Sequence, residues 1–158
     1  MPCHILRLLP LLGMLAAGMP SPAAAADLTI RNGVFWKDTA GTPIYSQGGG
    51  ILKVGATYYW YGAKYAEAVS YAREPAPRPN SGNPSFSAVT AYSSTDLVNW
   101  KFEGDVLQAG KAGKMFDMPG WVGRLGVVHN KRTGKYVLLT QYGSREHGRG
   151  VVFATSGS

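Results

Sequence analysis

One pattern of short strands occurs twice in this chain, and it constrains the fold more than any other feature. The aromatic run Tyr58 to Tyr61 is followed, after a long connection, by Ala91 to Ser94. The runs Tyr136 to Leu139 and Phe153 to Ser156 repeat this order when Tyr58 is set on Tyr136. Repeats that each contain several strands are typical of β-propeller blades, small sheets that pack around an axis. The alternative is a β-sandwich with coincidental hairpins.

The rest of the chain indicates an all-β fold. No segment repeats apolar residues at helical spacing over several turns, and Gly, Pro, Asn and Asp separate short β-branched or aromatic runs. We expect a hairpin turn at Gly55-Ala56 and an exposed, proline-rich loop from Ala72 to Pro84. The chain then holds about two blades, the second incomplete after its third strand, whereas propellers close with about four to eight. Strands are expected at 51–54, 57–61, 87–93, 126–129, 136–140 and 150–156.

The first residues predict export. Arg7 precedes an apolar stretch from Leu8 to Met19, and the small residues before Asp27 offer a cleavage site. We therefore expect residues 1–26 to be a secretory signal peptide and residues 27–158 to form the folded part. The apolar stretch is too short to span a bilayer, so no membrane association is expected after cleavage. The secreted chain, extracellular or periplasmic, would contain no cysteine, because Cys3 lies in the signal.

Charge and motif content exclude several function classes. The sequence has 16 Lys and Arg against 9 Asp and Glu, but the basic residues are scattered over several turns. Because no dense basic stripe occurs, we expect no nucleic-acid partner. No Cys/His cluster, phosphate-binding loop or catalytic Ser-His-Asp order is present, and His129 is a lone histidine, so no metal site and no cofactor is predicted. Whether calcium binds at a propeller axis, and the oligomeric state, stay open.

Four motifs carry a family resemblance. They are Asp38-Thr39-x-Gly41-x-Pro43-Ile44, Gly48-Gly49-Gly50-Ile51-Leu52, Tyr58-Tyr59-Trp60-Tyr61-Gly62 and Tyr92-Ser93-Ser94-Thr95-Asp96-Leu97-Val98-Asn99-Trp100. Together they resemble the first blades of glycoside hydrolase family 43, above all its exo-β-1,3-galactanase branch. The resemblance covers about Gly33 to Ser156 and implies the N-terminal part of a five-bladed propeller. It also implies hydrolysis of O-glycosyl bonds in plant-type polysaccharide: galactan, arabinan or galactofuranose-containing chains.

The chain departs from this family at its catalytic positions. Inverting hydrolysis needs a carboxylic acid and a carboxylate base. In the family the base Asp lies on the inner strand of the first blade, where this chain has Tyr45-Ser46-Gln47, and the acid Glu lies beyond Ser158. The galactanase branch has Glu at the places of Ala63 and Gly123. The catalytic residues therefore remain unknown, and we expect no hydrolysis by this chain; a non-catalytic carbohydrate-binding propeller is the alternative.

The candidates for contact with a polysaccharide or oligosaccharide lie near the expected inner strands. The Gln47 amide can orient a sugar hydroxyl or satisfy a turn, and Gly49 can admit a ligand or allow tight packing. Trp121 beside Arg124 offers an aromatic platform and a guanidinium, which suit a pyranose, although Trp121 also fits simple packing. Tyr61 belongs to a strand whose side chains alternate between the two faces of the sheet. We therefore expect at most one of the aromatic residues of this strand to line the mouth, the central opening of the propeller where a substrate would bind.

Four further residues are expected to have other roles. Asp96 fits the cap of a turn, and Trp100 fits a wedge between blades. Glu103 and Asp105 are expected in solvent, because acidic residues are rarely buried without a partner.

Overall fold

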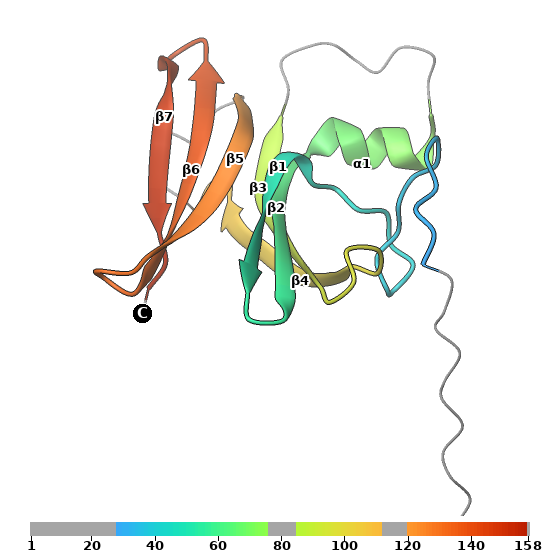
Figure 1. Ribbon diagram of the computed structural model, residues 1–158. Helices are drawn as coiled ribbons and strands as arrows, with labels where there is room; N and C mark the ends of the chain where they lie inside the picture. Colours follow the sequence, from blue (N-terminus) through green and yellow to red (C-terminus); the bar gives the residue numbers. More distant parts are fainter. Residues whose placement is uncertain (1–27, 76–84, 112–119, 158) are drawn as a thin grey trace, which may run out of the picture.

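The computed structural model describes residues 28–75, 85–111 and 120–157 (Figure 1). The expected signal peptide and most of the expected proline-rich loop lie outside these ranges. The described chain forms two antiparallel sheets, ordered β1-β2-β3-β4 and β5-β6-β7, so each strand pairs with its neighbour in sequence. The elements are β1 Gln47–Val54, β2 Thr57–Tyr65, α1 Ala66–Arg73, β3 Phe86–Ser94, β4 Lys101–Gln108, β5 Trp121–Asn130, β6 Lys135–Ser144 and β7 Gly148–Thr155.

The predicted all-β fold and its repeat are confirmed. The two sheets stand side by side like propeller blades (Figure 1), with β1 against β5. In the first sheet Tyr61 pairs with Ala91, and in the second Leu139 pairs with Phe153. Tyr61 coincides with Leu139 when Tyr58 is set on Tyr136, and Ala91 coincides with Phe153 when residues 91–94 are set on 153–156, so these two strands pair in the same register in both sheets.

Two elements were not predicted from the sequence. The expectation of no helix is wrong, because Ala66–Arg73 forms α1, which takes up the first residues of the expected loop. This helix has Glu67 in its first turn and Arg73 in its last, a charge order that favours a helix, but it is too short to show helical periodicity. The edge strand β4 alternates charged and apolar residues without a strong β signal. In the described ranges no helix is long and apolar enough to cross a membrane.

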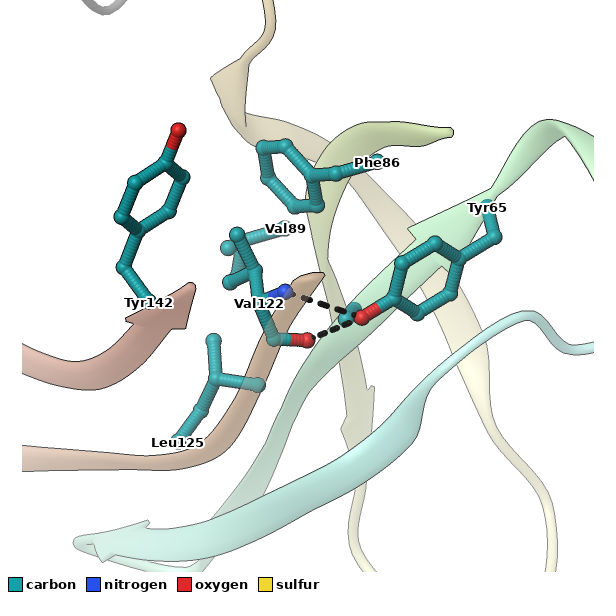
Figure 2. Packing of buried hydrophobic residues seen from close by; sticks show 7 residues of the cluster. Tyr65, Phe86, Val89, Val122, Leu125 and Tyr142 are labelled. Carbon is teal, nitrogen blue, oxygen red and sulfur yellow. Dashed lines mark hydrogen bonds between the residues drawn. The ribbon is translucent and has the colours of Figure 1, made fainter. Parts of the chain in front are cut away.

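The core lies between the two sheets (Figure 2). Val89 of β3 and Val122 of β5 are 0% and 1% exposed, among the most completely buried side chains of the described residues. The Tyr65 hydroxyl reaches across from β2, donates a hydrogen bond to the carbonyl oxygen of Val122 and accepts one from its amide at 3.0 Å. One side chain thus satisfies both backbone groups of a buried residue on the neighbouring sheet. Ala63, Phe86, Leu125 and Tyr142 complete the cluster.

The turn between β3 and β4 confirms the role expected for Asp96. Its carboxylate accepts hydrogen bonds from the amides of Val98 and Asn99 at 2.8 and 2.7 Å, and from the Asn99 side chain at 2.9 Å. The bonds from the Asn99 side chain, and then from these backbone amides, hold the pKa of Asp96 well below its usual range. Trp100, which we interpreted as a wedge between blades, packs on Trp60 of its own sheet, with ring centroids 5.3 Å apart, and is not part of the cluster between the two described sheets.

The expectation that Asp105 is solvent-exposed is also wrong. It forms an ion pair with Lys64 at 2.6 Å, and both side chains are less than a quarter exposed. The cross-strand position of these residues on β2 and β4 supplies the partner that sequence spacing did not show. Glu103 is exposed but bonded: a hydrogen bond from the Ser93 hydroxyl at 2.6 Å, and then one from Lys101, lower its pKa.

Candidate functional site

Both inner strands carry a β-bulge at the same place. The pairing register of β1 with β2 shifts between Gln47 and Gly50, and that of β5 with β6 shifts between Gly123 and Gly126. A bulge bends its strand and re-aims the side chains beside it. The two bulges also touch, since a Cβ added to Gly48 would lie 3.5 Å from the backbone nitrogen of Arg124.

Arg124 has an unusual backbone conformation in its bulge. Its φ is +51°, and Gly48, which occupies the same place in β1, has a φ of +58°. Glycine adopts this left-handed region freely, but it costs other residues roughly 1–2 kcal/mol. Strain of this kind persists where neighbouring structure enforces it, and it clusters at binding and catalytic sites. The strained backbone therefore marks Arg124 as the main candidate for a ligand contact in this region.

The Arg124 side chain is held by two neighbours. Its Nη1 donates a hydrogen bond to Oε1 of Gln141 at 2.7 Å, and its guanidinium carbon lies 5.9 Å from the ring centroid of Trp121. Arg124 itself is exposed, whereas Trp121 and Gln141 are half-buried. Within the described ranges no carboxylate forms an ion pair with Arg124. The remaining guanidinium N–H groups therefore face solvent beside an aromatic ring and an amide.

The other candidates on β1 occupy different surroundings. Gln47 is exposed, directly before the bulge that contacts Arg124, and pairs with Ala63. Gly49 lies against β2, where an added Cβ would come 1.6 Å from the carbonyl oxygen of Tyr61. Gln47 thus directly precedes Gly48, the residue that meets the Arg124 backbone, and it also lines a separate cavity of about 260 Å³ with Trp60 and Tyr71. Gly49 has a packing reason to lack a side chain.

Tyr61 is not part of this cluster. It lines a separate cavity of about 230 Å³ between the sheets, together with Val127, Tyr136 and Leu138. Burial, and then the neighbouring phenols of Tyr59 and Tyr136, raise the pKa of Tyr61.

We call the group of Gln47, Gly48, Trp121, Arg124 and Gln141 the mouth cluster.

Gln141 is the member of the mouth cluster that the sequence analysis missed. The alignment of Tyr58 on Tyr136 contains the signal, because it sets Gln141 on Ala63, the cross-strand partner of Gln47. The amide thus stands on β6 at the place where β2 has a small residue. A similar comparison of Gly48 with Arg124 would have indicated the left-handed bulge.

Acidic groups do not contribute to the mouth cluster. Among the residues that the structure describes, no carboxylate forms a hydrogen bond or an ion pair with a member of this cluster. Glu67 of α1 accepts the Ser85 backbone amide; burial opposes the ionised form, but hydrogen bonds from its own backbone amide and from Ser85 lower its pKa overall. The described ranges contain no group of three or more His, Cys, Asp or Glu that could hold a metal ion.

No protein-family model and no curated protein matches this sequence, but solved structures do. An exo-β-1,3-galactanase from Clostridium thermocellum is 31% identical, with a TM-score of 0.62 over 82% of this chain and 25% of its own. An exo-β-1,3-galactanase from Phanerochaete chrysosporium, solved with galactose, is 35% identical, with a TM-score of 0.62 over 80% of this chain and 26% of its own. The chain is glycoside hydrolase family 43-like.

A third solved structure supports this assignment. A family 43 β-1,3-galactosidase, solved with galactodeoxynojirimycin, is 33% identical, with a TM-score of 0.62 over 82% of this chain and 35% of its own. The predicted resemblance to the galactan-cleaving branch of family 43 is therefore confirmed. This family 43-like chain spans 25–35% of the length of the structures it matches.

Proposed function

We propose that this chain is part of a secreted, family 43-like glycoside hydrolase and that its mouth cluster binds galactose units of galactan-type oligosaccharides. The observation that carries the proposal is Arg124, strained in a bulge and presented beside Trp121 and Gln141. Similar structures support the ligand class: exo-β-1,3-galactanases from Phanerochaete chrysosporium were solved with galactose and with β-1,3-galactotriose. Export through residues 1–26 belongs to the same proposal.

The chemistry of the mouth cluster suits a pyranose. A pyranose presents an apolar C–H face, which can pack on the half-buried ring of Trp121. Its hydroxyl groups can accept hydrogen bonds from the free guanidinium N–H groups of Arg124. They can also donate hydrogen bonds to the side-chain carbonyl groups of Gln47 and Gln141 and accept them from the side-chain NH2 groups of these residues.

The same geometry argues for binding without cleavage by these residues alone. An inverting glycosidase places two carboxyl groups roughly 6.5–9.5 Å apart around the scissile bond. In the described part of the chain, the mouth cluster has no bonded carboxylate, and Ala63 and Gly123 stand where the galactanase branch has Glu. Hydrolysis would then require carboxyl groups from elsewhere in a longer protein. The described residues of the mouth cluster can therefore bind a sugar, but they cannot by themselves hydrolyse it.

Calorimetric titration of the chain with β-1,3-galactotriose tests the proposal. We expect saturable binding, and at least about a tenfold loss of affinity in Arg124→Ala, the equivalent of about 1.4 kcal/mol. Arg132→Ala removes an exposed arginine from the turn after β5 and should bind like the unchanged chain. No binding, or equal affinity of the Arg124 and Arg132 variants, would contradict the proposal. Turnover of an aryl galactoside that depends on a carboxylate of this chain would refute binding without cleavage.

A further inference from the structure

Helix α1 borders a cavity instead of the core. None of its residues, all of which the structure describes, is buried. Ala68 and Tyr71 are three positions apart, so they lie on one face of the helix, and both line the cavity of about 260 Å³ that Gln47 also lines. We call this space the α1 cavity. Because a short helix owes most of its stability to the packing of one face, an open face on α1 points to a ligand that covers it.

The walls of the α1 cavity come from the first sheet and its flanking segments. Trp60 of β2, α1 and the residues that lead into β1 contribute to it. Phe35 joins them, with its ring edge-to-face on the ring of Tyr71 at a centroid distance of 5.9 Å. Figure 1 shows α1 beside the end of the sheet at which β1 begins. All of these residues precede the second sheet, so the cavity has its walls without any contribution from β5–β7.

The chemistry of the α1 cavity suits one sugar ring. Its aromatic side chains can pack on the apolar C–H face of a pyranose, and the Tyr71 hydroxyl and the Gln47 amide can bond to sugar hydroxyls. Apolar walls with a few polar groups are the usual composition of a small-molecule site. A volume of about 260 Å³ lies below the roughly 300–1,000 Å³ of pockets for drug-sized ligands, so a single ring is the appropriate size.

The α1 cavity is adjacent to the mouth cluster along β1. Gln47 lines the cavity, and the next residue, Gly48, meets the backbone of Arg124. The Cα atoms of consecutive residues are about 3.8 Å apart, which is less than the span of two linked pyranose rings. One oligosaccharide can therefore reach from the mouth cluster into the cavity.

Tyr65 fixes the helix relative to the mouth cluster. Its hydroxyl bonds to both backbone groups of Val122, the residue that follows Trp121, and α1 begins directly after Tyr65. Glu67, in the first turn of the helix, accepts the backbone amide of Ser85 at 3.1 Å. The start of α1 is thus held from two sides, and the distance between the two sugar positions is set by hydrogen bonds.

We propose that the α1 cavity binds a second galactose unit of the oligosaccharide whose first unit lies on the mouth cluster. This inference rests on the proposed sugar-binding function of the mouth cluster and extends it from one unit to two. Tyr71 would contact the second unit with its ring, and Gln47 would lie between the two units. Two linked units that occupy two sites bind more tightly than one, because the second contact is intramolecular.

Titrations with galactose and with β-1,3-galactotriose separate the two positions. We expect the unchanged chain to bind the trisaccharide about tenfold more tightly than galactose, because one more ring is in contact. Tyr71→Ala should remove this difference and leave the affinity for galactose unchanged. Ala68→Trp should do the same by filling the cavity. Ser70→Trp, at an exposed position of α1 that does not line the cavity, is the matched control and should keep the difference.

NMR titration of the unchanged chain gives a test that needs no variant. Galactotriose should shift the backbone amides of Ala68 and Tyr71, whereas galactose should not. Equal affinities for the two sugars, a difference that persists in both Tyr71→Ala and Ala68→Trp, or no shift at α1 would overturn this inference and leave the proposed function standing. If neither sugar bound, the proposed function would fail and this inference with it.

Discussion

Replacing Arg124 by glycine and by alanine removes the same guanidinium but leaves two different backbones in the bulge of β5. At a φ of +51°, alanine keeps the left-handed strain and glycine relieves it. The relief is worth about 1–2 kcal/mol. In an ordinary strand glycine is less favourable than alanine by about 0.5–1 kcal/mol. We therefore expect the usual order to be reversed, with Arg124→Gly more stable than Arg124→Ala by about 1 kcal/mol.

Both variants lose the same side-chain interactions. The hydrogen bond to Gln141 at 2.7 Å and the contact with Trp121 are exposed, so together they contribute about 1–2 kcal/mol. Relief of strain offsets much of this loss in Arg124→Gly, which should unfold close to the unchanged protein. Affinity for β-1,3-galactotriose should fall by a similar factor in both variants, because both lack the guanidinium.

Urea unfolding followed by tryptophan fluorescence gives the stabilities, and calorimetry gives the affinities. Gly48→Ala is the matched control, because it introduces a side chain at the same place in β1, where φ is +58°, and should destabilise the protein. If Arg124→Ala were as stable as Arg124→Gly, or more stable, the left-handed conformation at this bulge would be refuted. If Arg124→Gly kept its affinity for the sugar, the guanidinium would not be a sugar contact.

Three further changes test the packing and the turn. Tyr65→Phe should destabilise the protein by about 2 kcal/mol, because both buried backbone groups of Val122 lose their partner; chemical denaturation measures this. Gly49→Ala should cost about 3 kcal/mol or more, because its Cβ would overlap the Tyr61 carbonyl, and soluble yield with circular dichroism reports the loss. The lowered pKa of Asp96 means that its contribution is complete above an unfolded-state pKa near 3.9 and declines as pH falls below it. Thermal unfolding between about pH 6 and about pH 2 should show this decline, which should be smaller in Asp96→Asn.

Each of these tests has a control. Tyr59→Phe changes a tyrosine of the same strand with no hydrogen bond to its hydroxyl within the described ranges, so it should destabilise the protein by less than about 0.5 kcal/mol. If Tyr65→Phe destabilised the protein no more than this, the two hydrogen bonds between the Tyr65 hydroxyl and the Val122 backbone would not contribute to stability. Gly126→Ala adds a Cβ that meets no atom within 4 Å, so only Gly49→Ala should fail to fold. Identical acid sensitivity of the Asp96→Asn variant would show that this carboxylate does not stabilise the turn.

The repeated strands could be predicted because their signals are local. Aromatic and β-branched runs bounded by turn residues are visible in the sequence. Setting Tyr58 on Tyr136 and residues 91–94 on 153–156 predicts equivalent pairs, and the pairings of Tyr61 with Ala91 and of Leu139 with Phe153 confirm them. The turn at Gly55-Ala56 and the cap by Asp96 were predictable for the same reason. Each depends on residues that are close together in the chain.

The features that the sequence did not predict depend on tertiary contacts. Helix α1 is short and has no buried residue, so it leaves no apolar periodicity. The partner of Asp105 is Lys64 on a strand far away in sequence, and the partner of Arg124 is Gln141 on β6. Positive φ at Arg124 goes against the preference of its residue type, and only the comparison with Gly48 could have indicated it.

An NMR titration of the isotope-labelled chain with β-1,3-galactotriose tests the central claim most directly, because it locates the bound sugar. We predict saturable shifts of the Trp121 indole and of the backbone amides of Gly48, Gly123, Arg124 and Gln141, with little change at the β1–β2 turn. Shifts confined to residues away from the mouth cluster, or no shifts at sugar concentrations well above those of the protein, would contradict the assignment of this cluster as a carbohydrate site.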